Sequence, residues 1–179
     1  MSPDPGDGRL ANGNGNESGN GKRKNKKPNN QGSLGFKGRT PSLEYHVYDI
    51  GNSNRDQFSR TTKEIAMYLA REVNGGGECI KAFDPDNLGF DPIISPADPP
   101  EGASYAVQKK YDLALTAASK KDETRADMAK RAFGIIIGQC SQALFDKLEA
   151  TQEYKQYLQD LDCIELLKLI NWSLYTDTV

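Results

Sequence analysis

The segment from Met1 to Ser33 sets the strongest limit on what this chain can fold into, because it offers almost nothing to bury. Gly, Asn, Ser and Pro dominate this segment, and Leu10 is its only large aliphatic residue after Met1. Such a segment cannot offset the conformational entropy that is lost when its backbone becomes ordered. We therefore predict two parts, a disordered tail over residues 1–33 and a folded domain over residues 34–179.

The charges of the chain are unevenly distributed, although its net charge is only −2. Residues 1–30 hold six Lys or Arg against three acidic residues, which places +3 at this end and −5 on the remainder. Five of the cations fall within six positions, namely Lys22, Arg23, Lys24, Lys26 and Lys27. Such a cluster favours contact with RNA phosphates or nuclear import, and a tail that only aids solubility is the alternative.

The composition argues against secretion and membrane insertion. The start of the chain is polar where a signal peptide needs about 7–15 apolar residues, and no stretch approaches the roughly 18–20 apolar residues of a membrane span. Three widely spaced cysteines fit neither a disulfide framework nor a zinc site. We expect a chain with free thiols in the cytoplasm, with the nucleus as a second candidate location, that binds no membrane, metal or other cofactor.

The spacing of apolar residues predicts an all-α domain of about four helices. Repeats of three to four residues indicate helices over 55–73, 104–120, 122–150 and 161–175. Asn52 or Asn54 is expected to cap the first helix, and Asp160 or Asp162 the last. Five prolines between residues 82 and 102 predict an extended connection between the first and second helices.

Two further features of the domain carry specific expectations. Gly134 and Gly138 lie inside the predicted third helix, where each costs about 1 kcal/mol relative to Ala, so we expect another helix to approach closely there. Within residues 34–54, alternating apolar positions predict an extended segment that lies on the helices. The alternating residues are Leu43, Tyr45 and Val47.

The sequence contains no recognisable catalytic constellation. His46 is the only histidine, and because no nucleophile motif accompanies it, we interpret it as an ordinary surface residue. A thiol nucleophile at Cys140 is less favoured than a core cysteine, because the residue lies in the apolar stripe of the predicted third helix. We therefore expect a chain that is not an enzyme, has no small-molecule substrate and works by binding other macromolecules.

Several motifs between residues 36 and 170 occur in a distinctive order. The most specific is Gly138-Gln139-Cys140-Ser141 with Leu144 and Leu148, followed by Leu166, Leu167 and Ile170. Weaker elements are Phe36-Lys37-Gly38 with Thr40-Pro41, then Gln57-Phe58, then Asp98-Pro99-Pro100. In this order the motifs resemble those of Gag-like proteins, the capsid and nucleocapsid precursors of copia-type retrotransposons from algae and related microbial eukaryotes.

The resemblance implies a structural protein whose helical domain self-associates into a homo-oligomer and packages the RNA of the element. Proteins of this type commonly carry a downstream zinc knuckle, and none precedes Val179, so the basic cluster at residues 22–27 remains the candidate RNA contact. We also expect the helical domain to be incomplete at its C-terminal end. Two alternatives stay open: a truncated remnant of an element without function, and a nuclear-targeted adaptor.

Overall fold

The computed structural model describes residues 35–51 and 56–176. Two units, residues 1–34 and 35–179, make up the chain, and every described element belongs to the second. The predicted tail with its basic cluster therefore lies outside the described residues, as do Asn52 and Asn54, the predicted caps of the first helix.

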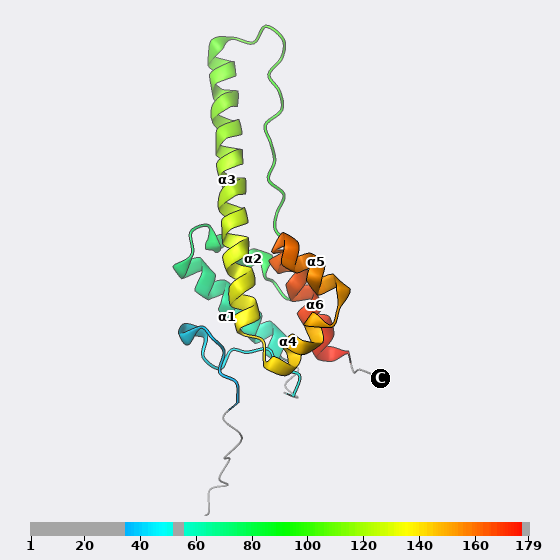
Figure 1. The fold of residues 1–179 in the computed structure, drawn as a ribbon. Coiled ribbons are helices and arrows are strands. Elements are labelled where there is room, and N and C mark those ends of the chain that lie inside the picture. Colours follow the sequence, from blue (N-terminus) through cyan, green and yellow to red (C-terminus); the bar gives the residue numbers. More distant parts are fainter. Residues whose placement is uncertain (1–34, 52–55, 177–179) are drawn as a thin grey trace, which may run out of the picture. The chain divides into compact units, whose positions relative to one another are not determined.

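The described part of the chain is an all-α domain, as predicted, in which no strand is formed. Short 3₁₀ turns, η1 (Pro41–Leu43) and η2 (Gly76–Glu78), accompany six α-helices within this part (Figure 1). The helices are α1 (Gln57–Glu72), α2 (Cys79–Ala82), α3 (Tyr105–Gly138), α4 (Gln142–Glu149), α5 (Gln152–Asp160) and α6 (Cys163–Tyr175).

The hydrophobic core lies around α6 and the C-terminal part of α3. Helix α6 packs against α3, α4 and α5, while α1 packs against α2 and α3. Leu166, Leu167 and Ile170 of α6 are fully buried, and they belong to the same core as Phe133 and Ile136 of α3. The regularly spaced apolar residues of both helices therefore face the core, as the sequence predicts.

Side-chain caps fix where the last three helices begin. The Asp162 carboxylate accepts hydrogen bonds from the backbone N–H groups of Ile164 at 3.0 Å and Glu165 at 3.1 Å, which makes it the cap of α6. The hydroxyls of Ser141 and Thr151 accept corresponding bonds at the starts of α4 and α5. Of the two caps predicted for the last helix, Asp162 is the one that is used.

The predicted boundaries of the second and third helices were wrong. Helix α3 runs without interruption through Lys121, where a break was expected, because residues 120–123 are all tolerated in a helix and include neither Gly nor Pro. The predicted third helix is in turn interrupted after Gly138, and α4 begins at Gln142. Helix α5 was not predicted at all.

The segment predicted to be extended within residues 34–54 contacts α1, but it forms a 3₁₀ turn and further turns, and its buried positions differ from the expected alternation. Leu43 and Tyr48 are buried, whereas Tyr45 is 68% exposed. The 3₁₀ turn at Pro41–Leu43 and the left-handed backbone of Tyr45, with φ of 71°, disrupt the two-residue repeat. Tyr48 instead forms an isolated parallel β-bridge with Cys140.

The close helix approach expected at Gly134 and Gly138 is also absent. A Cβ atom built at Gly134 would meet nothing within 4 Å. At Gly138 the neighbour is the segment before α1 and not a helix, since the backbone N–H of Arg39 donates to the Gly138 carbonyl at 2.9 Å.

Close approach is instead required at Gly76, in the turn that follows α1. A Cβ atom there would overlap the backbone carbonyl of Leu69, which cannot rotate away because it belongs to the last turn of α1. The next residue, Gly77, has open space around its missing side chain. Only the first of these two glycines is therefore required by packing.

We expect Gly76→Ala to lower the free energy of unfolding by about 2 kcal/mol or more, because the backbone must move to admit a methyl group. Gly77→Ala is the matched control, and it should change stability by less than about 1 kcal/mol. Urea denaturation of the two variants measures the difference. Equal effects at both positions would contradict this account of the turn.

Candidate functional site

The side chain of Gln139, in the interruption between α3 and α4, is fully buried. Its Oε1 accepts hydrogen bonds from the backbone N–H groups of Arg39 at 3.0 Å and Thr40 at 3.1 Å. Its Nε2 donates to the carbonyls of Leu43 at 2.9 Å and His46 at 2.8 Å. A primary amide can accept two bonds and donate two, so every position of this amide is occupied.

Backbone hydrogen bonds also join Tyr48 to the residues between α3 and α4. The N–H of Tyr48 donates to the Gln139 carbonyl at 2.8 Å, and the Tyr48 carbonyl accepts from the N–H of Ser141 at 2.8 Å. The buried hydroxyl of Tyr48 lies 2.9 Å from the hydroxyl of Thr62 in α1. Burial raises the pKa of Tyr48 far above its ordinary value, so this phenol remains neutral.

A second glutamine fixes the other end of this segment, which we call the clasped segment (residues 38–49). The Gln57 side chain accepts from the backbone N–H of Asp49 at 2.8 Å and donates to the Asp49 carbonyl at 2.9 Å. The Thr61 hydroxyl donates to the Val47 carbonyl at 3.2 Å. Two helices, α1 and α3, are thus joined through the backbone of one short segment.

Gly38 is needed at the start of the clasped segment. Its φ of +88° lies in the left-handed region, and a Cβ atom there would collide with the side-chain amide of Gln139. The Gly38 and Gln139 positions, which the family resemblance places in separate motifs, are therefore in direct contact.

All the other residues of the most specific motif are also buried. Gly138, Cys140, Ser141, Leu144 and Leu148 lie at or after the end of α3, and Leu166, Leu167 and Ile170 lie in α6. The apolar members of the set join one core. The motif therefore stabilises the domain and does not form an exposed binding surface.

The three cysteines are free and buried, and Cys140 lies in the core as expected. Burial raises the pKa of Cys79 and Cys140 to about 12 and that of Cys163 further still. These thiols are protonated at neutral pH, and a thiol is a much weaker nucleophile than a thiolate. Across the residues that the structure describes, no group of His, Cys, Asp and Glu side chains is arranged to hold a metal ion.

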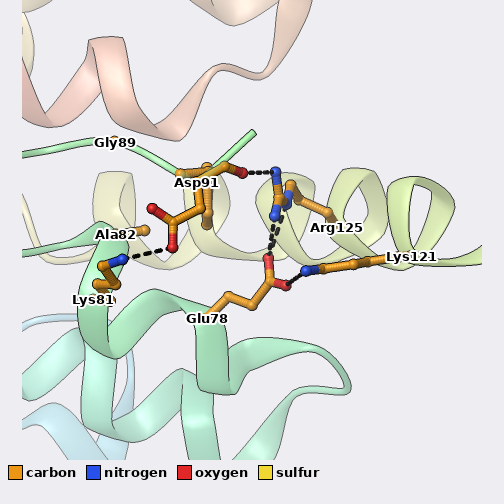
Figure 2. A pocket seen from close by; sticks show the side chains of 8 residues that line it. Glu78, Lys81, Ala82, Gly89, Asp91, Lys121 and Arg125 are labelled. Carbon is orange, nitrogen blue, oxygen red and sulfur yellow. Dashed lines mark hydrogen bonds and ion pairs between the residues drawn. The ribbon is translucent and has the colours of Figure 1, made fainter. Parts of the chain in front are cut away.

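A cluster of charged side chains surrounds a small cavity of about 190 Å³ between α2 and α3 (Figure 2). Glu78 lies between Arg125 and Lys121 and contacts their side-chain nitrogens at 2.8 Å and 3.0 Å. Burial raises the pKa of Glu78, but the hydrogen bonds from Lys121 and Arg125 outweigh this effect and lower it overall. The donors of this cluster already have acceptors within the chain, so its role is structural.

The cluster attaches the proline-rich connection to α3. Arg125 Nη1 donates to the Asp91 carbonyl at 2.7 Å, and its guanidinium lies 5.2 Å from the centre of the Phe90 ring. The Asp91 carboxylate pairs with Lys81 at 2.7 Å. Sequence reasoning missed this cluster because its members are charged residues far apart in the chain with no common motif.

The N-terminal part of α3 differs sharply from the rest of the domain. From residue 105 to residue 127, which we call the α3 arm, no side chain is buried, and the buried residues of the helix begin at Met128. The arm nevertheless carries large exposed apolar side chains. These are Tyr105, which is 81% exposed, Leu113, which is 64% exposed, and Val107 and Leu115.

An apolar stripe of the arm continues the core-facing side of α3. Eighteen residues make about five full turns of an α-helix, so residues 18 apart lie on the same side. This relation places seven arm residues in line with core or core-contacting residues of α3, and five of the seven are apolar. The apolar pairs are Tyr111 with Ala129, Ala114 with Ala132, Leu115 with Phe133, Ala117 with Ile135, and Ala118 with Ile136.

We call Tyr111, Ala114, Leu115, Ala117 and Ala118 the arm stripe. The same helix face that packs into the core at one end thus extends past the core at the other. No described helix is both long and apolar enough to cross a membrane. Comparison with family models, with curated proteins and with solved structures finds no match to the chain.

We expect Gln139→Ala to lower the free energy of unfolding by about 3 kcal/mol or more, because it leaves buried backbone groups of the clasped segment without partners. Gln142→Ala is the control, since the Gln142 side chain is exposed and bonds only to Asp146. A surface change of this kind should cost about 0.5 kcal/mol or less. Both are measured by urea denaturation. Similar losses of unfolding free energy for the two variants would show that the hydrogen bonds between Gln139 and the clasped segment are not a main source of stability.

Proposed function

We propose that this chain is a Gag-like structural protein that self-associates through the α3 arm and binds RNA through the basic cluster at residues 22–27. The observation that carries the proposal is the arm stripe, an apolar helix face with no helix packed against it in the described chain. A helix without tertiary packing is marginally stable in water, and exposed apolar stripes commonly mark interaction surfaces.

A second copy of the chain is the partner that the stripe suits best. Every copy presents the same stripe, so a two-fold axis between antiparallel arms brings like residues together in a self-complementary interface. Ala114 and Ala118 are small and permit close approach of two helices, while Tyr111 and Leu115 supply apolar area. The arm is about 35 Å long at 1.5 Å per residue, which gives the pair several turns of contact.

The chemistry of the described residues also fits a structural role. The thiols are protonated, the buried Gln139 amide is fully hydrogen-bonded, and the charged cluster at Glu78 is internally paired. These groups serve the fold, and the proposal rests on the exposed arm and, by sequence, on the basic cluster. The resemblance to Gag-like proteins supports the same interpretation.

The self-association is tested by Ala114→Glu, which places a charge in the arm stripe. Its control, Ala106→Glu, makes the same change at an exposed alanine of the same helix whose counterpart 18 residues later, Thr124, does not belong to the core. We expect the wild type and Ala106→Glu to form dimers as concentration rises in sedimentation velocity, and Ala114→Glu to need at least about tenfold higher concentration. A wild type that stays monomeric throughout, or equal behaviour of the two variants, would contradict the proposal.

The RNA contact is tested by changing the five cations of the cluster to Gln. Each phosphate contact contributes about 0.7 to the slope of log affinity against log salt for single strands, so the slope should fall by up to about 3.5. Fluorescence polarisation with a labelled oligouridine at several salt concentrations measures it. Changing the four lysines to Arg keeps the charge and should retain binding, and unchanged binding by the Gln variant would refute the contact.

A further inference from the structure

The proline-rich connection lies beside the arm, so it bears directly on how the arm stripe can meet a partner (Figure 1). We call residues 89–101 the strap. Its first end is firmly attached: the Gly89 N–H donates to the Ala82 carbonyl at 2.9 Å, and Arg125 binds the Asp91 carbonyl. Phe90 also lies against Phe83, with 6.3 Å between ring centres.

The remainder of the strap is weakly held. Among the described contacts, no backbone–backbone hydrogen bond involves residues 92–99. Prolines at positions 92, 96 and 99 have no N–H group with which to form one. Ile94, the largest apolar side chain of this stretch together with Ile93, is 84% exposed and does not pack on the helix.

One side-chain contact holds this part of the strap to the arm. The Tyr111 hydroxyl donates to Asp98 Oδ1 at 2.7 Å, and this bond raises the pKa of Tyr111. Tyr111 belongs to the arm stripe. It and Ala118 are partly buried, whereas Ala114 and Leu115 are exposed.

The strap and a second arm therefore compete for the same helix face. Arg125 anchors the first end of the strap. It lies seven residues, or about two helical turns, after Ala118 and so on the side of the helix that carries the stripe. A strap fixed at Asp91 and held at Asp98 crosses this face between its two attachments. Its anchored end involves several groups. At its far end the described hydrogen bond is the one from Tyr111, beside the partly buried Ile93, Pro96 and Pro99.

We propose that the strap is a displaceable cover of the arm stripe, released at Asp98 and retained at Asp91 when two copies pair. The inference rests on the proposed self-association through the arm. It assigns a regulatory role to an acidic segment: the strap carries Asp91, Asp98 and Glu101 and no Lys or Arg. Conditions that weaken the bond between Asp98 and Tyr111 will favour pairing of the arms.

The test compares the dimer dissociation constants of full-length variants by sedimentation velocity. Asp98→Ala removes the acceptor and Tyr111→Phe removes the donor while keeping the ring. Each should tighten the dimer about ten- to a hundredfold, because each of the two copies releases one bond worth about three- to tenfold. Glu101→Ala removes a negative charge from the same strap without breaking this bond, and it should change the constant by less than about twofold.

The outcomes separate the strap from the arm. If the wild type dimerises and Ala114→Glu prevents it, but Asp98→Ala and Tyr111→Phe leave the constant unchanged, the cover is refuted and the self-association stands. Weaker dimers in these two variants would place the strap within the interface and also refute the cover. If every variant remains monomeric, the self-association itself fails, and the cover fails with it.

Discussion

The buried amide of Gln139 is the interaction on which the rest of the domain depends. It interrupts what would otherwise be a single helix and satisfies four backbone groups of a segment about a hundred residues earlier in the chain. Because a buried polar group without a partner costs more than a made hydrogen bond gains, this arrangement is favourable only when all four bonds form together. These four hydrogen bonds thereby fix the end of α3, the start of α4 and the path of the backbone from Gly38 to Tyr48.

Because the C-terminal end of α3 is fixed, the orientation of its exposed N-terminal end is fixed as well. The helix is continuous, so the orientation of its face in the core determines the orientation of the arm stripe about five turns earlier. The hydrogen bonds of Gln139 and the packing of the core thus hold the arm at a defined angle. The ion pairs of Glu78 stabilise α3 near the point where it leaves the core. This division into a rigid base and an exposed apolar helix is what supports a structural role.

The sequence was sufficient for features that depend on neighbours along the chain. The apolar repeat of α6 and its cap, expected at Asp160 or Asp162 and found at Asp162, are local patterns. The interruption at Gln139 could not be predicted, since a glutamine inside an apolar repeat is compatible with a helix until its partners near Arg39 are known. The pairing of Glu78 with Arg125 likewise joins residues 47 apart by ordinary surface charges. For the site, the sequence singles out the motif at Gly138–Ser141, which the structure places in the core. The exposed arm was not recognised because its residues were divided between two predicted helices.

Hydrogen exchange of the arm at increasing protein concentration tests most directly whether the arm is a pairing surface. In a single chain no side chain from residue 109 to residue 124 is buried, whereas α6 lies in the core. We predict that raising the concentration slows exchange in the arm about tenfold or more and leaves exchange in α6 unchanged. Exchange in the arm that is fast and independent of concentration over the whole range would contradict the account.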